Sequence, residues 1–250
     1  MEGWITEIGP LGALDLGLAQ RAIERPRGQD PWMAHQVRRN RWIQALMGAR
    51  GWCLSQQDVE AVLQGKPGRF LPQHREFGLI RNLNLLLDLV EERAERKVLP
   101  TGPSLLLDYR RLVKGLPDRI LGLRKGRAWD LPHGFEAPRP VLLPRLLARF
   151  REGNAYLAPY SDFKGKHPVL QGAALCRQFL RLSPFESENA VLALLATGQF
   201  LMAHGYPPFL PLRSDRPTLM SLALEDAKVF EDWFTEVLFL TQSFSFGLLD

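Results

Sequence analysis

The feature that most constrains the fold is an apolar segment over residues 192–203, preceded by a short polar turn over 182–188. Its only polar side chains are one threonine and one glutamine, and a helix that is apolar on every side belongs in the centre of a globular domain. Gly205 and Pro207 follow it, as a glycine and a proline often follow the last turn of a helix. We therefore predict that the chain packs around this helix.

A second helix is expected before the turn, because Val169, Ala173, Cys176 and Leu180 recur at helical spacing. Where two helices meet at a short turn, the second offers its free backbone N–H groups, which favour anions. The turn is therefore a candidate anion site. Periodicity and end signals predict further helices over 34–47, 59–63, 77–97, 104–114, 142–150 and 219–240.

The turn and the helices beside it resemble the Fic (Fido) family of nucleotide-dependent modifying enzymes. The family signature, His-Pro-Phe-x-Asp/Glu-Gly-Asn-Gly-Arg-x-x-Arg, opens a buried helix that ends near Gly-Tyr-Pro. The frame of this signature is present in Pro184, Phe185, Asn189 and Gly205-Tyr206-Pro207, and the preceding helix is similar in His167-Pro168, Ala173-Ala174 and Phe179. The resemblance implies a mainly α fold, a helical bundle around a buried central helix with one small β-hairpin flap. It covers about residues 36–212, and we predict an N-terminal arm over 1–35 and one Fic-like helical domain over 36–250.

The residues that carry the family's chemistry are replaced. Ser183 stands at the catalytic histidine, Ser187 at the metal-binding acid, Glu188 and Ala190 at the two glycines, and Val191 and Leu194 at the two arginines. A serine hydroxyl has far too high a pKa to act as a general base near neutral pH. Glu188 would place a carboxylate where phosphate should bind, so we expect the protein to fill its own anion site. A simpler interpretation makes Ser183, Glu186, Ser187 and Asn189 ordinary helix-start residues.

An inhibitory-type helix is the second feature that the resemblance implies, over residues 36–65. Some Fic proteins carry an inhibitory glutamate there, paired with the second motif arginine. On this register Gln44 stands at the glutamate and Leu194 at the arginine, so both charges are lost together. An unpaired buried glutamate would be costly, which explains a joint loss.

The flap is expected near 119–130, where Lys125-Gly126 is a candidate turn between two short apolar runs. Gly122 and Arg124 match part of the family's Gly-x-Tyr-Arg. Together with Lys125, Arg127 and Trp129 they are our predicted partner-binding residues, facing a groove against the turn at 183–189. The alternative is a solvated basic loop.

Charge and composition limit the remaining functions. The net charge is +5, but residues 71–151 hold 16 basic and 9 acidic side chains, whereas residues 152–250 hold 7 and 11. This charge would suit nucleic acid, yet no recognised binding module accompanies it. No run approaches a membrane span, no secretory signal is visible, and the two cysteines suit a reducing cytoplasm. The five histidines show no metal-ligand spacing: His35, His74, His133, His167 and His204.

Three hypotheses follow. The first is a catalytically inactive Fic-like protein of the cytoplasm that binds another protein as a regulator or scaffold, without cofactor or metal. The second is a modifier that still transfers AMP or a related group to a hydroxyl, using ATP with Mg²⁺ and Glu186 or Glu188 as metal ligand. The third is a protein associated with nucleic acid.

Overall fold

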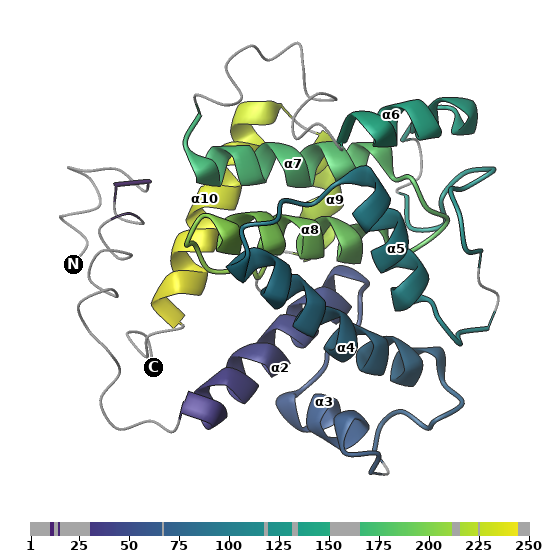
Figure 1. Ribbon diagram of the computed structural model, residues 1–250, viewed down its shortest axis with the longest axis vertical. Helices are drawn as coiled ribbons and strands as arrows, with labels where there is room; N and C mark the ends of the chain where they lie inside the picture. The colour runs from purple at the N-terminus through teal and green to yellow at the C-terminus, as the bar shows by residue number, and fades with distance from the viewer. Residues whose placement is uncertain are drawn as a thin grey trace.

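The computed structural model describes residues 11–12, 15, 31–66, 68–117, 120–131, 135–150, 166–211, 216–224 and 226–244. Regular structure within these residues is helical, and no β-strand occurs among them (Figure 1). The helices are α2 (Pro31–Ala49), α3 (Gln56–Leu63), α4 (Arg75–Glu95), α5 (Gly102–Leu112), the 3₁₀ turn η1 (Pro140–Leu142), α6 (Leu143–Phe150), α7 (Pro168–Leu182), α8 (Asn189–Ala203), α9 (Arg216–Leu224) and α10 (Ala227–Phe244).

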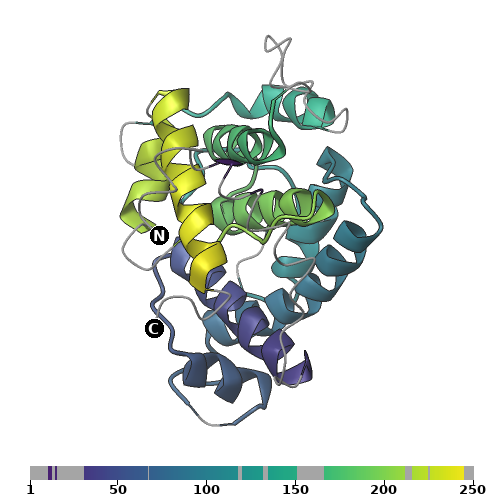
Figure 2. The ribbon, with the colours of Figure 1, turned by 90° about the vertical axis from the view of Figure 1, so that its left-hand side faces the viewer.

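Helix α8 is the centre of the molecule, as its apolar sequence predicts. Every residue from Asn189 to Leu201 is buried. Helices α7, α4, α2 and α5 contact it, and the two views show it crossing the middle of the bundle (Figures 1 and 2). The other helices form an outer layer, with α9 and α10 on α7, α3 on α2 and α4, and α6 on α5. The predicted mainly helical bundle around a buried central helix is therefore confirmed.

Small residues let the helices approach α8 closely. A Cβ at Gly198 would lie 2.7 Å from Cζ2 of Trp42, so this glycine makes room for the indole ring of α2. A Cβ at Gly172 in α7 would lie 3.0 Å from a methyl group of Leu201. These two contacts fix where α2 and α7 lie along α8, because interiors pack without space for an extra methyl group.

Side-chain caps set where several helices begin. Ser55 and Asp58 form the capping box at α3 that the sequence suggests, and Thr101 and Ser104 form another at α5. The His167 side chain accepts a hydrogen bond from the Val169 backbone N–H at the start of α7. Caps of this kind stabilise a helix by about 1 kcal/mol each.

Two differences from the predicted elements concern the C-terminal part. The single helix predicted over 219–240 is two helices, α9 and α10, because Asp226 interrupts it. Oδ1 of Asp226 accepts a hydrogen bond from the Lys228 N–H at 2.7 Å, as an aspartate at a helix start does. Helix α10 also continues to Phe244, past residue 240 where the predicted helix ends; residues 245–250 lie outside the described residues.

The predicted arm over residues 1–35 lies mostly outside the described residues. Helix α2 begins at Pro31, before the boundary predicted at residue 36. Leu11 packs against the core, and the Asp15 carboxylate lies 3.1 Å from Nε2 of His167 and accepts a 2.5 Å hydrogen bond from the Tyr206 hydroxyl. At Asp15 the N-terminal part of the chain therefore contacts His167, just before α7, and Tyr206, just after α8.

Candidate functional site

The turn between α7 and α8 is held by two residues in the left-handed backbone conformation. Ser183 ends α7 with φ 38° and ψ 65°, and Glu188 precedes α8 with φ 63° and ψ 18°. Glycine adopts this conformation without strain, whereas other residues lose about 1 kcal/mol or more. Glu188 therefore keeps the backbone shape that a glycine would give at this position, at an energetic cost that its side chain must offset.

Ser183 is fully buried, and its side chain hydrogen-bonds to the backbone. Its hydroxyl donates to the Leu180 carbonyl at 2.6 Å, and its N–H donates to the Phe179 carbonyl at 2.9 Å. Both are C-terminal capping bonds of α7. The residue in the catalytic-histidine position thus ends a helix, with its only hydroxyl proton engaged.

Asn189 closes the turn and joins it to the segment 120–131. Its Oδ1 accepts from the Phe185 N–H at 3.0 Å, and its Nδ2 donates to the Phe185 carbonyl at 2.9 Å. Nδ2 also donates to Oδ1 of Asp130 at 2.9 Å, while the Asn189 backbone N–H donates to Oδ2 at 2.7 Å. The Asp130 carboxylate therefore occupies the anion position at the start of α8.

This finding corrects the predicted occupant of the anion site. Glu188 makes no side-chain capping bond to α8. Its carboxylate points instead to two arginines: Oε1 lies 2.9 Å from Nε of Arg50 and 3.1 Å from Nη2 of Arg75. Arg50 also contacts Glu76 at 3.2 Å, so two arginines and two glutamates alternate.

In the ion pairs at Glu188, the glutamate is buried and the two arginines are partly exposed. The Glu188 side chain is 0% exposed, whereas the side chains of Arg50 and Arg75 are 24% and 19% exposed. Oε2 of Glu188 has no hydrogen-bond partner within the described part of the chain. A buried carboxylate is tolerated when cations pair with it, so the two arginines account for a glutamate at this position.

Burial shifts two acidic groups beside the turn. It raises the pKa of Asp130, an effect opposed by the two hydrogen bonds from Asn189 and reinforced by the Glu188 charge. Burial also raises the pKa of Tyr109, opposed by the hydrogen bond with Ser187. The Tyr109 ring stacks on Phe185 with centroids 4.1 Å apart, so this tyrosine packs as a neutral group under the turn.

The segment 120–131 contacts the turn, but it is not the predicted hairpin. The Arg124 N–H donates to the Pro184 carbonyl at 3.0 Å and the Trp129 N–H to the Glu186 carbonyl at 2.7 Å. Backbone groups that bond to the turn cannot also pair with each other, so no ladder forms here. The prediction of a β-hairpin flap is therefore wrong for these residues, and the alternative of a loop describes them better.

The predicted partner-binding residues divide into structural and exposed ones. Arg124 is 3% exposed, and its guanidinium donates to the carbonyls of Ser183, Gly126 and Pro138 at 2.7, 2.8 and 2.6 Å. Burial lowers its pKa. Lys125, Arg127 and Trp129 are exposed. Gly122 is half-buried, and a Cβ added to it would meet nothing within 4 Å.

The structure describes both positions at which the resemblance implies a lost ion pair, Gln44 and Leu194. Leu194 is fully buried in the core, and Gln44 is half-buried with its amide donating to the Leu54 carbonyl at 3.0 Å. The helix that carries Gln44 does pack on α8, through Trp42. The charged contact to the turn comes instead from Arg50, immediately after that helix, and sequence reasoning missed both Arg50 and Arg75.

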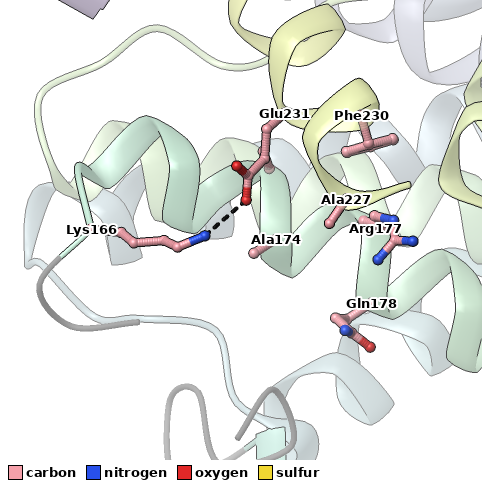
Figure 3. A pocket seen from close by; sticks show the side chains of 8 residues that line it. Lys166, Ala174, Arg177, Gln178, Ala227, Phe230 and Glu231 are labelled. Atoms are coloured by element: carbon pink, nitrogen blue, oxygen red, sulfur yellow. Dashed lines mark hydrogen bonds and ion pairs between the residues drawn. The ribbon is translucent and has the colours of Figure 1, made fainter. Parts of the chain in front are cut away.

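Two hollows lie elsewhere on the described surface, and residues 183–189 line neither. One of about 40 Å³ lies between α7 and α10, where Lys166 and Glu231 form an ion pair at 3.0 Å beside Arg177 (Figure 3). The other, about 260 Å³, lies along α4 at Phe77, Arg81 and Leu85.

No cluster of three or more histidine, cysteine, aspartate or glutamate side chains suited to a metal occurs among the described residues. No helix among them is long and apolar enough to cross a bilayer.

Comparison with known proteins identifies the fold. No family profile matches the chain, and no curated protein matches it in sequence. A Fic domain-containing signaling protein from Bacteroides thetaiotaomicron superposes with a TM-score of 0.77 at 14% identity, covering 95% of this chain and 96% of that one. A Fic family protein from Desulfovibrio desulfuricans gives 0.67 at 19% identity, covering 96% and 75%. Fic-1 from C. elegans gives 0.69 at 15% identity, covering 96% and 71%. Over nearly its whole length, the chain has the fold of the Fic-domain proteins.

Proposed function

We propose that this chain is a Fic-fold protein that has lost group-transfer chemistry and acts by binding another protein. The observation that carries the proposal is the pair of carboxylates at the start of α8. Asp130 accepts the Asn189 N–H, and Glu188 is buried between Arg50 and Arg75. A nucleotide phosphate would need the same donors, and it would meet two negative charges there.

The absence of a suitable base supports the same proposal. A general base must be able to accept a proton near neutral pH and must reach the target hydroxyl. The Ser183 hydroxyl donates to the Leu180 carbonyl inside the core, and both Asp130 oxygens accept hydrogen bonds from Asn189. Ser183 and Asp130 are therefore both engaged in holding the turn.

The direct test is a transfer assay with the purified chain and radiolabelled ATP, with Mg²⁺ or Mn²⁺, on itself and on cell lysate. We expect no labelling and no increase in Tm with ATP and metal, while an active adenylyltransferase labels the same lysate. The second hypothesis predicts transfer that is lost in Glu186→Gln or Glu188→Gln, and such transfer would refute our proposal.

A variant tests whether the protein's own carboxylate fills the arginine site. Glu188→Gly leaves Arg50 and Arg75 facing an unoccupied position, so inorganic phosphate should raise its Tm more than that of the wild type. A ligand that binds only the folded state at 100 times its Kd stabilises by about 2.7 kcal/mol. Equal phosphate effects on Glu188→Gly and the wild type would show that the glutamate does not occupy an anion site.

A further inference from the structure

The described residues between 120 and 149 expose charges of almost one sign. The exposed cations are Lys125, Arg127, Arg139, Arg145 and Arg149, against one exposed acid, Glu136. Helix α6 presents its two arginines outward because its leucines face the core, with Leu143 0% and Leu147 6% exposed. Among the exposed residues that the structure describes here, an acidic partner would find an excess of positive charge.

Large apolar side chains are exposed among these cations. Trp129 is 68% and Val141 is 79% exposed, and Leu121 and Leu142 are 44% and 46% exposed. Aromatic residues and arginine are enriched where proteins bind each other and supply most of the binding energy when desolvated. Single exposed leucines are ordinary, but a tryptophan and a valine on one charged segment offer a partner apolar area to bury.

Hydrogen bonds hold the parts of this segment together. Nε of Arg110 in α5 donates to the Leu121 carbonyl at 2.9 Å, and an Arg127 nitrogen donates to the Phe135 carbonyl at 3.2 Å. Nη2 of Arg124 donates to the Pro138 carbonyl at 2.6 Å, which fixes the approach to η1. Figure 1 shows α5, α6 and the described residues 120–131 on one side of the molecule. The surface is therefore pre-organised, which lowers the ordering cost of binding.

Two other classes of partner fit these residues less well. A nucleic acid backbone would satisfy the cations but would leave the aliphatic Val141 and Leu142 without a counterpart, since single strands bind by charge and base stacking. A bilayer would be bound by a helix with an apolar face lying in the interface, and the apolar face of α6 is already buried in the core.

We infer that the exposed side of residues 120–131 and 135–149 binds an acidic protein segment that also carries apolar side chains. The cations around Lys125, Arg139 and Arg145 would attract its carboxylates, and Trp129 and Val141 would pack against its apolar groups. This inference rests on the proposed function, because it gives the chemistry of the partner that such a protein binds. It also moves the contact from the predicted groove to the outer side of the segment, since the inner side is hydrogen-bonded to the turn.

The test uses two fluorescein-labelled probes of equal length, polyglutamate and a random copolymer of glutamate and tyrosine, at about 0.15 M ionic strength. The full chain should bind the copolymer about tenfold more tightly than polyglutamate, which corresponds to about 1.4 kcal/mol. The variant Lys125→Glu/Arg139→Glu/Arg145→Glu should weaken binding of both probes about tenfold or more. Trp129→Ser should remove most of the preference for the copolymer while leaving polyglutamate binding nearly unchanged.

The matched control, Arg38→Glu/Lys66→Glu/Arg96→Glu, makes the same charge change at exposed positions outside residues 120–149. If it weakens binding as much as the test variant, the attraction belongs to the whole protein and the inference is wrong. The inference also fails if the chain prefers phosphatidylserine vesicles or a single-stranded oligonucleotide over the copolymer. Circular dichroism must show that each variant is folded. Transfer activity in the ATP assay would refute the proposed function whatever the probes do, whereas an inert chain that ignores both probes would refute this inference alone.

Discussion

Replacing Glu188 tests the central ion pairs of the turn. Removing one partner of a buried ion pair costs about 3–5 kcal/mol, because the remaining charge is left uncompensated. Here the remaining charges are the two arginines, which are 24% and 19% exposed, and Arg50 keeps its contact with Glu76. Water can therefore solvate part of the charge, and we expect Glu188→Ala to lower the free energy of unfolding by about 2–3 kcal/mol.

The backbone at Glu188 makes glycine the better replacement. At φ 63° an alanine keeps the left-handed strain, whereas a glycine relieves it. After allowing for the greater entropy of glycine in the unfolded chain, Glu188→Gly should be about 0.5–1 kcal/mol more stable than Glu188→Ala. Inside a helix an alanine is more stable than a glycine, so the expected order here is the reverse. Both variants remove the same charge, so the difference between them in urea denaturation measures the backbone effect alone.

A double-mutant cycle isolates the pair itself. Glu188→Gln combined with Arg75→Met should show a coupling of about 1–2 kcal/mol, within the range found for residues in contact. The control is Glu188→Gln with Arg93→Met, since Arg93 pairs with Asp108. That cycle should be additive within about 0.5 kcal/mol. Additivity in the Arg75 cycle as well would refute the ion pair as the reason that a glutamate is tolerated in the turn.

Three further predictions concern the groups around the turn. The pKa of Asp130 is raised above its ordinary 3.8, so the folded state binds the carboxyl proton more tightly than the unfolded state does. The free energy of unfolding should therefore fall as pH rises from 3.8 through the folded pKa. Urea denaturation at several pH values should show this fall in the wild type and not in Asp130→Asn. Arg124→Met leaves three carbonyls without their donor and should lower the free energy of unfolding, measured with urea, by about 3–5 kcal/mol. The exposed control Lys125→Met should lower it by about 0.5 kcal/mol or less, and equal losses would contradict a structural role for Arg124. Leu194→Arg should lower the free energy of unfolding by about 3–5 kcal/mol, because it buries an unpaired charge. Adding Gln44→Glu to the same chain should restore part of this loss through a new ion pair. Strictly additive effects in chemical denaturation would place Gln44 away from the start of α8.

The buried helix and its turn could be predicted because their signals are local. Thirteen consecutive buried residues need an apolar sequence, and α8 has one. The capping box of α3 likewise depends on Ser55 and Asp58, which are only three residues apart. Even the break between α9 and α10 had a local signal that was missed, since Asp226 is a good helix start directly before an apolar-periodic stretch.

The partners of Glu188 could not be predicted, because they are distant in the sequence. Arg50 lies 138 residues and Arg75 113 residues from it. A buried glutamate implies a cation, but nothing in the sequence selects these two among the chain's 32 lysines and arginines. The β-hairpin prediction was wrong for a related reason. Lys125-Gly126 is a typical turn sequence, but the N–H groups of Arg124 and Trp129 on either side of it donate to the carbonyls of Pro184 and Glu186. Local turn signals do not reveal a competing long-range acceptor.

The ion pair at the turn has the opposite polarity to the one that the family resemblance implies. There, an acid on the inhibitory helix pairs with an arginine of the motif; here, the motif supplies Glu188 and the arginine, Arg50, directly follows the corresponding helix. Either polarity attracts α2 to the start of α8, so the packing of the two helices survives the exchange. Under the proposed function, phosphate binding is lost in this exchange, because the Glu188 carboxylate already pairs with Arg50 and Arg75 and a phosphate in that position would have to displace it. The comparison of phosphate effects on Glu188→Gly and the wild type tests this step: equal effects would show that the glutamate does not hold a place that a phosphate could take.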